Sequence, residues 1–66
     1  MKDVYSFVAN KDNTIVGCDS HLLSSKEEAY EIANNLLGIF IDANYIEIFK
    51  YINNKFVFFG TVREKE

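Results

Sequence analysis

The segment Cys18-Asp19-Ser20-His21 brings a thiol, a carboxylate, a hydroxyl and an imidazole together within four residues. Such groups can bind a metal ion or form a Cys/His nucleophilic pair. The chain has one cysteine and one histidine, whereas structural zinc takes four protein ligands and catalytic zinc takes three plus water. Residues this close on a strand end also rarely face each other productively. We therefore expect Cys18 to be a small core residue and His21 to lie in a loop, with no metal bound.

The other residue types that could carry chemistry have simpler explanations. Ser24 and Ser25 lie outside any Gly-x-Ser-x-Gly motif, and helix capping accounts for both. Gly17, Gly38 and Gly60 are too dispersed to form a phosphate-binding loop. Gly17 and Gly60 instead indicate a bulge or close packing within strands. We predict that the protein is not an enzyme and uses no cofactor.

Length and composition indicate one small domain over residues 1–66. Of its 66 residues 48% are hydrophobic and 15% aromatic, which excludes the composition of a disordered chain. A net charge of −3 without a basic cluster argues against duplex DNA as a partner. One cysteine allows no internal disulfide, and the sequence has neither a signal peptide nor an apolar run of ~18 residues, so we expect a cytoplasmic protein and no membrane span.

The N-terminal third predicts a hairpin, with strands over 4–9 and 14–18 joined by the turn cluster of residues 10–13. A four-residue loop would place Ala9 opposite Thr14, Phe7 opposite Val16 and Tyr5 opposite Cys18. This face is bulkier than the opposite one. We expect it to contact the helix.

A helix begins at Ser24 or Ser25, because each serine precedes a glutamate by three residues in the pattern of a capping box. Its apolar residues share one side of a helical wheel, and this pattern continues through Gly38. We therefore predict a helix over about 25–43 that ends at Asn44. The alternative ends it at Leu37. The polar side includes an acidic face, made of Glu27, Glu28 and Glu31, which is either solvated or guides the protein to a basic partner surface.

The C-terminal third predicts a second hairpin, over residues 45–63, with Asn53-Asn54 as a two-residue turn. Half-buried strands alternate apolar and polar residues, but these two strands are apolar on both faces. One face carries Tyr45, Phe49, Tyr51, Phe56, Phe58 and Val62. The other face carries Ile46, Ile48, Ile52, Val57 and Phe59, with Lys50 and Lys55 among them.

The order of elements predicts a two-layer ββαββ fold of the α+β class, with the helix on one face of a four-stranded, mostly antiparallel sheet. One helix covers one face, so the other must be exposed or occupied by a partner. The two lysines favour the aliphatic face as the outer one, whereas Glu47 and the tyrosine hydroxyls favour the aromatic face. We expect the aromatic face to be outer, because tyrosine is enriched at interfaces.

These observations predict a non-enzymatic protein-interaction module. We expect it to be a regulator or inhibitor, of the kind found on phages and mobile elements, that binds and occludes a partner protein and forms a homodimer. The predicted interaction residues are Tyr45, Phe49, Tyr51, Phe56 and Phe58. The alternative is single-stranded nucleic-acid binding by stacking of bases on the same aromatic residues. An enzyme or small-ligand carrier is disfavoured, because one helix over one sheet leaves little room for a pocket.

Overall fold

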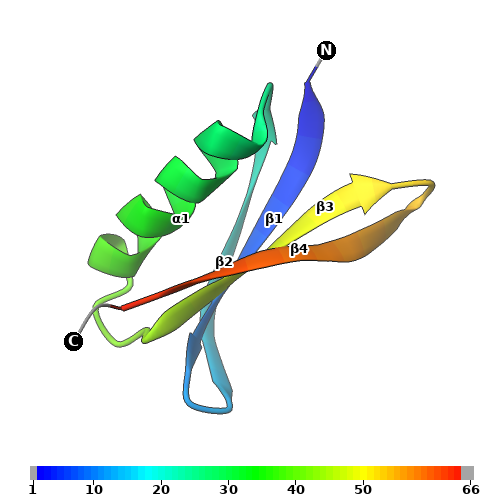
Figure 1. Cartoon of the computed structure of the whole chain (residues 1–66). Coiled ribbons are helices and arrows are strands. Elements are labelled where there is room, and N and C mark those ends of the chain that lie inside the picture. Colours follow the sequence, from blue (N-terminus) through cyan, green and yellow to red (C-terminus); the bar gives the residue numbers. More distant parts are fainter. Residues whose placement is uncertain (1, 65–66) are drawn as a thin grey trace.

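The predicted two-layer ββαββ architecture is confirmed by a computed structural model that describes residues 2–64 (Figure 1). The chain runs through β1 (Asp3–Lys11), β2 (Thr14–Leu23), α1 (Lys26–Ile39), β3 (Tyr45–Ile52) and β4 (Lys55–Arg63). The strands form one open sheet in the order β2-β1-β3-β4, and all three neighbouring pairs are antiparallel. The helix lies against one face and contacts all four strands. The sheet therefore has a helix-side face and an outer face.

The start of α1 follows from the capping serines. Ser25 has an extended backbone, and its Oγ accepts a hydrogen bond from the Glu28 amide (3.3 Å). The Glu28 carboxylate in turn accepts one from the Ser24 amide (3.0 Å). Both amides would otherwise lack a partner at the helix end. Ser25 is therefore the N-cap, and of the two capping boxes that the sequence offered the structure forms the one of Ser25 and Glu28, to which Ser24 contributes only its backbone amide.

The helix ends at Ile39, so the predicted extension to about residue 43 is wrong, and so is the alternative end at Leu37. The Phe40 amide still donates to the Leu36 carbonyl oxygen (2.8 Å), but the Phe40 backbone leaves the helical region. The Asn44 amide then donates to the carbonyl oxygen of Asn10 in β1 (2.8 Å). The periodic pattern of apolar residues would allow the helix to continue past Ile39. Contacts with the sheet end it there.

The β1–β2 hairpin is tighter than predicted. Lys11 pairs with Thr14 around a two-residue turn, in which Asp12 has a φ of 55°. Tyr5 therefore lies opposite His21, and Phe7 opposite Asp19, instead of opposite Cys18 and Val16. A bulge at Ala9 and Asn10 shifts the register again towards the turn. The expectation that the Tyr5–Phe7–Ala9 face meets the helix is nevertheless correct, because all three are buried.

The β3–β4 hairpin keeps the predicted turn and part of the predicted register. Asn53 and Asn54 both have positive φ, and Phe49 pairs with Phe58 as expected. A bulge then inserts Phe59, so Ile48 pairs with Gly60. Because a one-residue insertion reverses the direction of the following side chains, Val62 lies on the helix side. It was expected on the aromatic face.

The core lies between α1 and the two central strands. Its largest fully buried side chains are Phe7, Ile46 and Ile48. The helix contributes small residues, Ala29 and Ala33, which allow it to approach the sheet closely. Larger, partly buried side chains of the helix layer, Tyr30, Ile32, Leu37 and Phe40, pack around this core.

Two aromatic side chains of the helix layer pack directly on glycines in the edge strands. A Cβ added to Gly60 would overlap the Tyr30 hydroxyl, and one added to Gly17 would lie 2.5 Å from the Phe40 ring. Both glycines therefore mark close packing beside a bulge, as the sequence predicted. Gly38 differs, because no atom lies within 4 Å of a Cβ built there.

Replacing Gly60 by alanine is expected to lower the free energy of unfolding by about 1–3 kcal/mol, since overpacking displaces Tyr30 or the helix. The double variant G60A/Y30F removes the overlapping oxygen and should recover part of this loss. Chemical denaturation followed by circular dichroism measures both effects.

Gly38→Ala is the matched control for Gly60→Ala. It adds the same methyl group at an open helical position and should stabilise the protein by up to about 1 kcal/mol. Equal destabilisation by the two alanines would contradict the assignment of Gly60 as a packing site.

Candidate protein-interaction surface

The five predicted interaction residues lie on the outer face of β3 and β4. Ile46 and Ile48 are buried against the helix layer. Because side chains alternate along a strand, Tyr45, Phe49 and Tyr51 point the other way. Their partners in β4 continue this face, where Phe58 pairs with Phe49 and Phe56 with Tyr51. The aromatic face is therefore the outer face, as expected.

Tyr45 and Phe49 are half-buried and make internal contacts. The Tyr45 hydroxyl donates to the Asp12 carbonyl oxygen in the β1–β2 turn (3.0 Å), and the Arg63 guanidinium lies over the Tyr45 ring, 4.9 Å from its centroid. Phe49 packs against Phe58 in a T-shaped arrangement, with ring centroids 5.8 Å apart. Tyr45 thus has a structural role that its place in an aromatic stripe did not reveal.

Tyr51, Phe56 and Phe58 are the exposed part of the aromatic face. Phe56 is 51% exposed and Phe58 56% exposed, although phenylalanine has no polar atom to benefit from water. The Tyr51 and Phe56 rings form a second T-shaped pair, with centroids 5.1 Å apart. These rings hold one another in place while leaving much of their surface to solvent.

The helix-side face is also uncovered where the β3–β4 hairpin ends. All residues from Tyr51 to Phe58 are exposed, including Ile52 and Val57, whose side chains point to the helix side. Figure 1 shows this turn projecting away from α1. We call residues 51–58 the hairpin end. Both faces of the hairpin end are exposed, in agreement with the apolar residues that the sequence places on both faces. Ile52 and Val57 were not among the predicted interaction residues, but they are part of this exposed surface.

The acidic face of the helix points away from this surface. Glu27, Glu28 and Glu31 are exposed on α1, which covers the opposite side of the sheet from the aromatic rings. One flat partner surface cannot contact both. Glu28 also caps its own helix, so the acidic face is not a preformed part of the aromatic site.

Cys18 and His21 do not form a site. Cys18 is an exposed residue within β2, which corrects the expectation of a core thiol. His21 also lies in β2 instead of a loop, with Nε2 2.9 Å from an Asp19 carboxylate oxygen and its ring against Phe7. The register directs His21 to the helix side and Cys18 to the outer face. Among residues 2–64, no group of three side chains is arranged to hold a metal ion.

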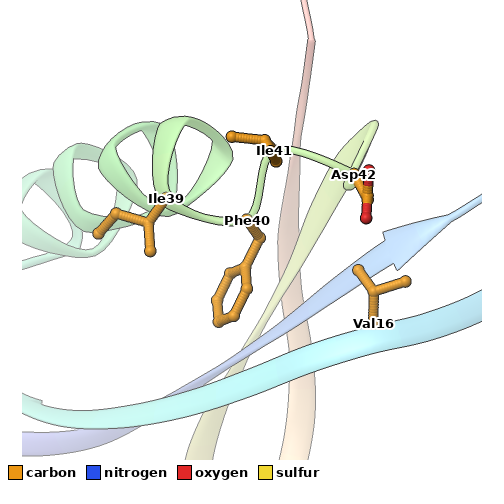
Figure 2. Close-up of a pocket in the computed structure, with 5 residues that line it drawn as sticks. All are labelled: Val16, Ile39, Phe40, Ile41 and Asp42. Carbon is orange, nitrogen blue, oxygen red and sulfur yellow. The ribbon is translucent and has the colours of Figure 1, made fainter.

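A shallow hollow lies at the far end of the molecule, where the helix meets β2 (Figure 2). It is lined by Val16, Ile39, Phe40, Ile41 and Asp42 and has a volume of about 220 Å³. Small-molecule sites usually measure roughly 300–1,000 Å³ and contain several convergent polar groups. Asp42 supplies the one charged group here, so the hollow lacks the features of a ligand site.

No helix in the described part of the chain is long and apolar enough to cross a membrane. Comparisons with protein-family models, with curated proteins and with solved structures gave no match.

The two outer tyrosines should respond differently to loss of the hydroxyl. Tyr45→Phe is expected to lower the free energy of unfolding by about 0.5–1.5 kcal/mol, because it breaks the bond to the Asp12 carbonyl. Tyr51→Phe is the matched control, since it makes the same change at an exposed ring, and it should change stability by less than about 0.5 kcal/mol. Equal effects in urea denaturation would contradict a structural role for Tyr45.

Proposed function

We propose that the protein is a non-enzymatic interaction module that binds and occludes a partner protein through the hairpin end and the aromatic face beside it. The observation that carries this proposal is the exposure of five large apolar side chains on both faces of one projecting hairpin. These residues are Tyr51, Ile52, Phe56, Val57 and Phe58.

Exposed apolar residues are ordinary when they are scattered, but contiguous patches mark interaction sites. Buried aromatic anchors also supply a large share of binding energy at protein interfaces. Phe56 and Phe58 fit this role, because each is exposed and held by a neighbouring ring. A rigid anchor loses little conformational entropy on binding. The partner is therefore expected to offer an apolar surface that packs on these outer rings.

This role matches a regulator or inhibitor, whose action requires occupation of a surface and no chemistry. We place it in the cytoplasm, where an exposed thiol such as Cys18 stays reduced, and we propose that the protein works as a homodimer. The acidic helix face, turned away from the anchors, would remain in solvent or guide the approach of a basic partner.

Single-stranded nucleic acid is the alternative ligand for the same rings. Base stacking needs accessible ring faces beside a basic track for the phosphates. The charged side chains that β3 and β4 direct outward are Glu47 and Arg63, and Arg63 already lies over Tyr45. The outer face therefore offers rings without a basic track, and this favours a protein partner.

The proposed function is tested by affinity capture from the native host with a tagged chain, followed by mass spectrometry. One protein should be enriched reproducibly, and the purified pair should bind with 1:1 or 2:2 stoichiometry in calorimetry. The variant F56S/F58S should weaken that affinity at least 100-fold, because it removes both anchors.

The matched control is I39S/I41S, which removes two exposed apolar side chains from the opposite end of the molecule. It should bind as the wild type does. If both double variants bind equally well, the hairpin end is not the site. Salt-dependent binding of a random single-stranded oligonucleotide, lost in F56S/F58S, would replace the proposal by the nucleic-acid alternative.

A further inference from the structure

The edge of β4 at the hairpin end is open to pairing with another strand. β4 is the last strand of the sheet, so one of its sides has no neighbour among residues 2–64. Natural proteins protect such edges with charges, proline, bulges or a covering element. Residues 56–58 have none of these, since they are Phe-Val-Phe, they are exposed, and the bulge comes after them. This part of the edge is unprotected.

The opposite edge of the sheet shows the contrast. β2 carries Asp19 and His21 along its length, and it has a bulge near its start. The Phe40 ring also packs over Gly17. These features disfavour pairing with a further strand, so the two edges of the sheet are not equivalent.

We propose that β4 pairs with β4 of a second copy, antiparallel and across a two-fold axis at Val57. This inference deepens the proposed function, because it specifies the dimer through which the module acts. The two-fold axis makes the contact isologous, so each contact between residues i and j is repeated between j and i. Phe56 of each copy then lies opposite Phe58 of the other, and the two Val57 residues face each other.

The backbone of this segment suits the pairing. Ile52 and Lys55 flank the two-residue turn and bond to each other across it. Because bonding directions alternate along a strand, the N–H and C=O groups of Phe56 and Phe58 point away from β3. These groups are the ones that an antiparallel second copy would engage. The bulge at Phe59 limits the regular pairing to this short stretch.

The side chains of two copies are also complementary in this register. On the outer face, the Tyr51–Phe56 pair of one copy continues into the Phe58–Phe49 pair of the other, which forms a row of four rings. Lys55 lies opposite Phe59 of the second copy, so no like charges face each other. The helices of both copies lie on the other side, and the combined outer face remains available to a protein partner.

The area available predicts a dimer of modest affinity. Edge pairing covers only the exposed β4 side chains Phe56, Val57 and Phe58, which offer roughly 250 Å² per copy, taking about 150–250 Å² for a whole aromatic side chain. Together with the paired backbone, this gives about 700 Å² in total, below the ~1,000 Å² of a stable specific interface, so the dimer is weak. The dimer should therefore dissociate on dilution.

Sedimentation and light scattering over a range of concentrations test this dimer. The wild type should shift with concentration from 7.6 kDa to twice that mass. Val57→Lys should remain monomeric, because it places two ammonium groups at the axis. Val16→Lys is the matched control, since both valines are 38% exposed on the helix side of an edge strand, and it should dimerise as the wild type does.

A crosslinking experiment decides the register even if V57K fails to fold. Residues opposite each other in antiparallel strands have Cα atoms about 4.5–5.5 Å apart, within disulfide range. Oxidised V57C/C18S should therefore form a covalent dimer rapidly, and V16C/C18S should not.

A wild type that stays monomeric at millimolar concentration would overturn the inference, as would a dimer that V57K leaves intact or a failure of V57C/C18S to crosslink faster than the control. The proposed function is judged separately, by whether monomeric V57K, whose outer rings are unchanged, still binds the captured protein.

Discussion

The length of the single helix limits how much of the sheet can be covered. A helix of 14 residues is about 21 Å long, whereas the nine- and ten-residue strands extend about 30 Å or more. The helix contacts all four strands, so it crosses the sheet and leaves the strand ends uncovered. Apolar residues beyond its reach, as in the hairpin end, remain in solvent although they belong to regular strands.

Within that limit, contacts at the ends of the core fix where the helix lies. Tyr30 packs on Gly60 in one edge strand, and Phe40 packs on Gly17 in the other. The helix layer therefore reaches both edges of the sheet through two aromatic rings, while its alanines contact the centre. Glycines in the edge strands leave room for the rings of Tyr30 and Phe40, and alanines let the helix approach the central strands. This close packing allows one short helix to contact all four strands.

The segment between the helix and β3 is fastened by hydrogen bonds to the first hairpin. The Asn44 side chain accepts from the Asp12 amide (3.2 Å) and donates to the Asp12 carboxylate (3.1 Å). Nearby, the buried Asn10 side chain donates to the Glu47 carboxylate (3.1 Å). These bonds lie at one end of the β1–β3 ladder and join the start of β3 to β1 and its turn. They also explain why the helix could not continue to Asn44.

The fold class could be predicted from sequence because it depends on local signals that the structure preserves. The Ser25 cap and the Asn53-Asn54 turn are both determined by near neighbours. What failed depended on distant contacts. The helix end is set by Phe40 and Gly17, 23 residues apart in sequence. The strand registers are set by two bulges, whose place Gly17 and Gly60 indicated but whose effect on the register they did not. The outer face was identified correctly, but Tyr45 and Phe56 look alike in sequence and differ in exposure.

The bulge at Phe59 connects the core to the exposed hairpin end. Phe59 packs on Tyr5 and Tyr30, with ring centroids 5.5 and 6.2 Å apart, while Phe58 faces outward, and the bulge brings Gly60 to the helix side next to Phe59. Adjacent phenylalanines thus serve opposite purposes, one in the core and one in solvent. A regular strand would have placed Gly60 and Phe58 on one face and lost the Tyr30 contact on the other. The bulge therefore allows the helix to pack closely on Gly60, and it also ends the regular part of the β4 edge. A mutation that removes the bulge would change both the core and the exposed edge of β4.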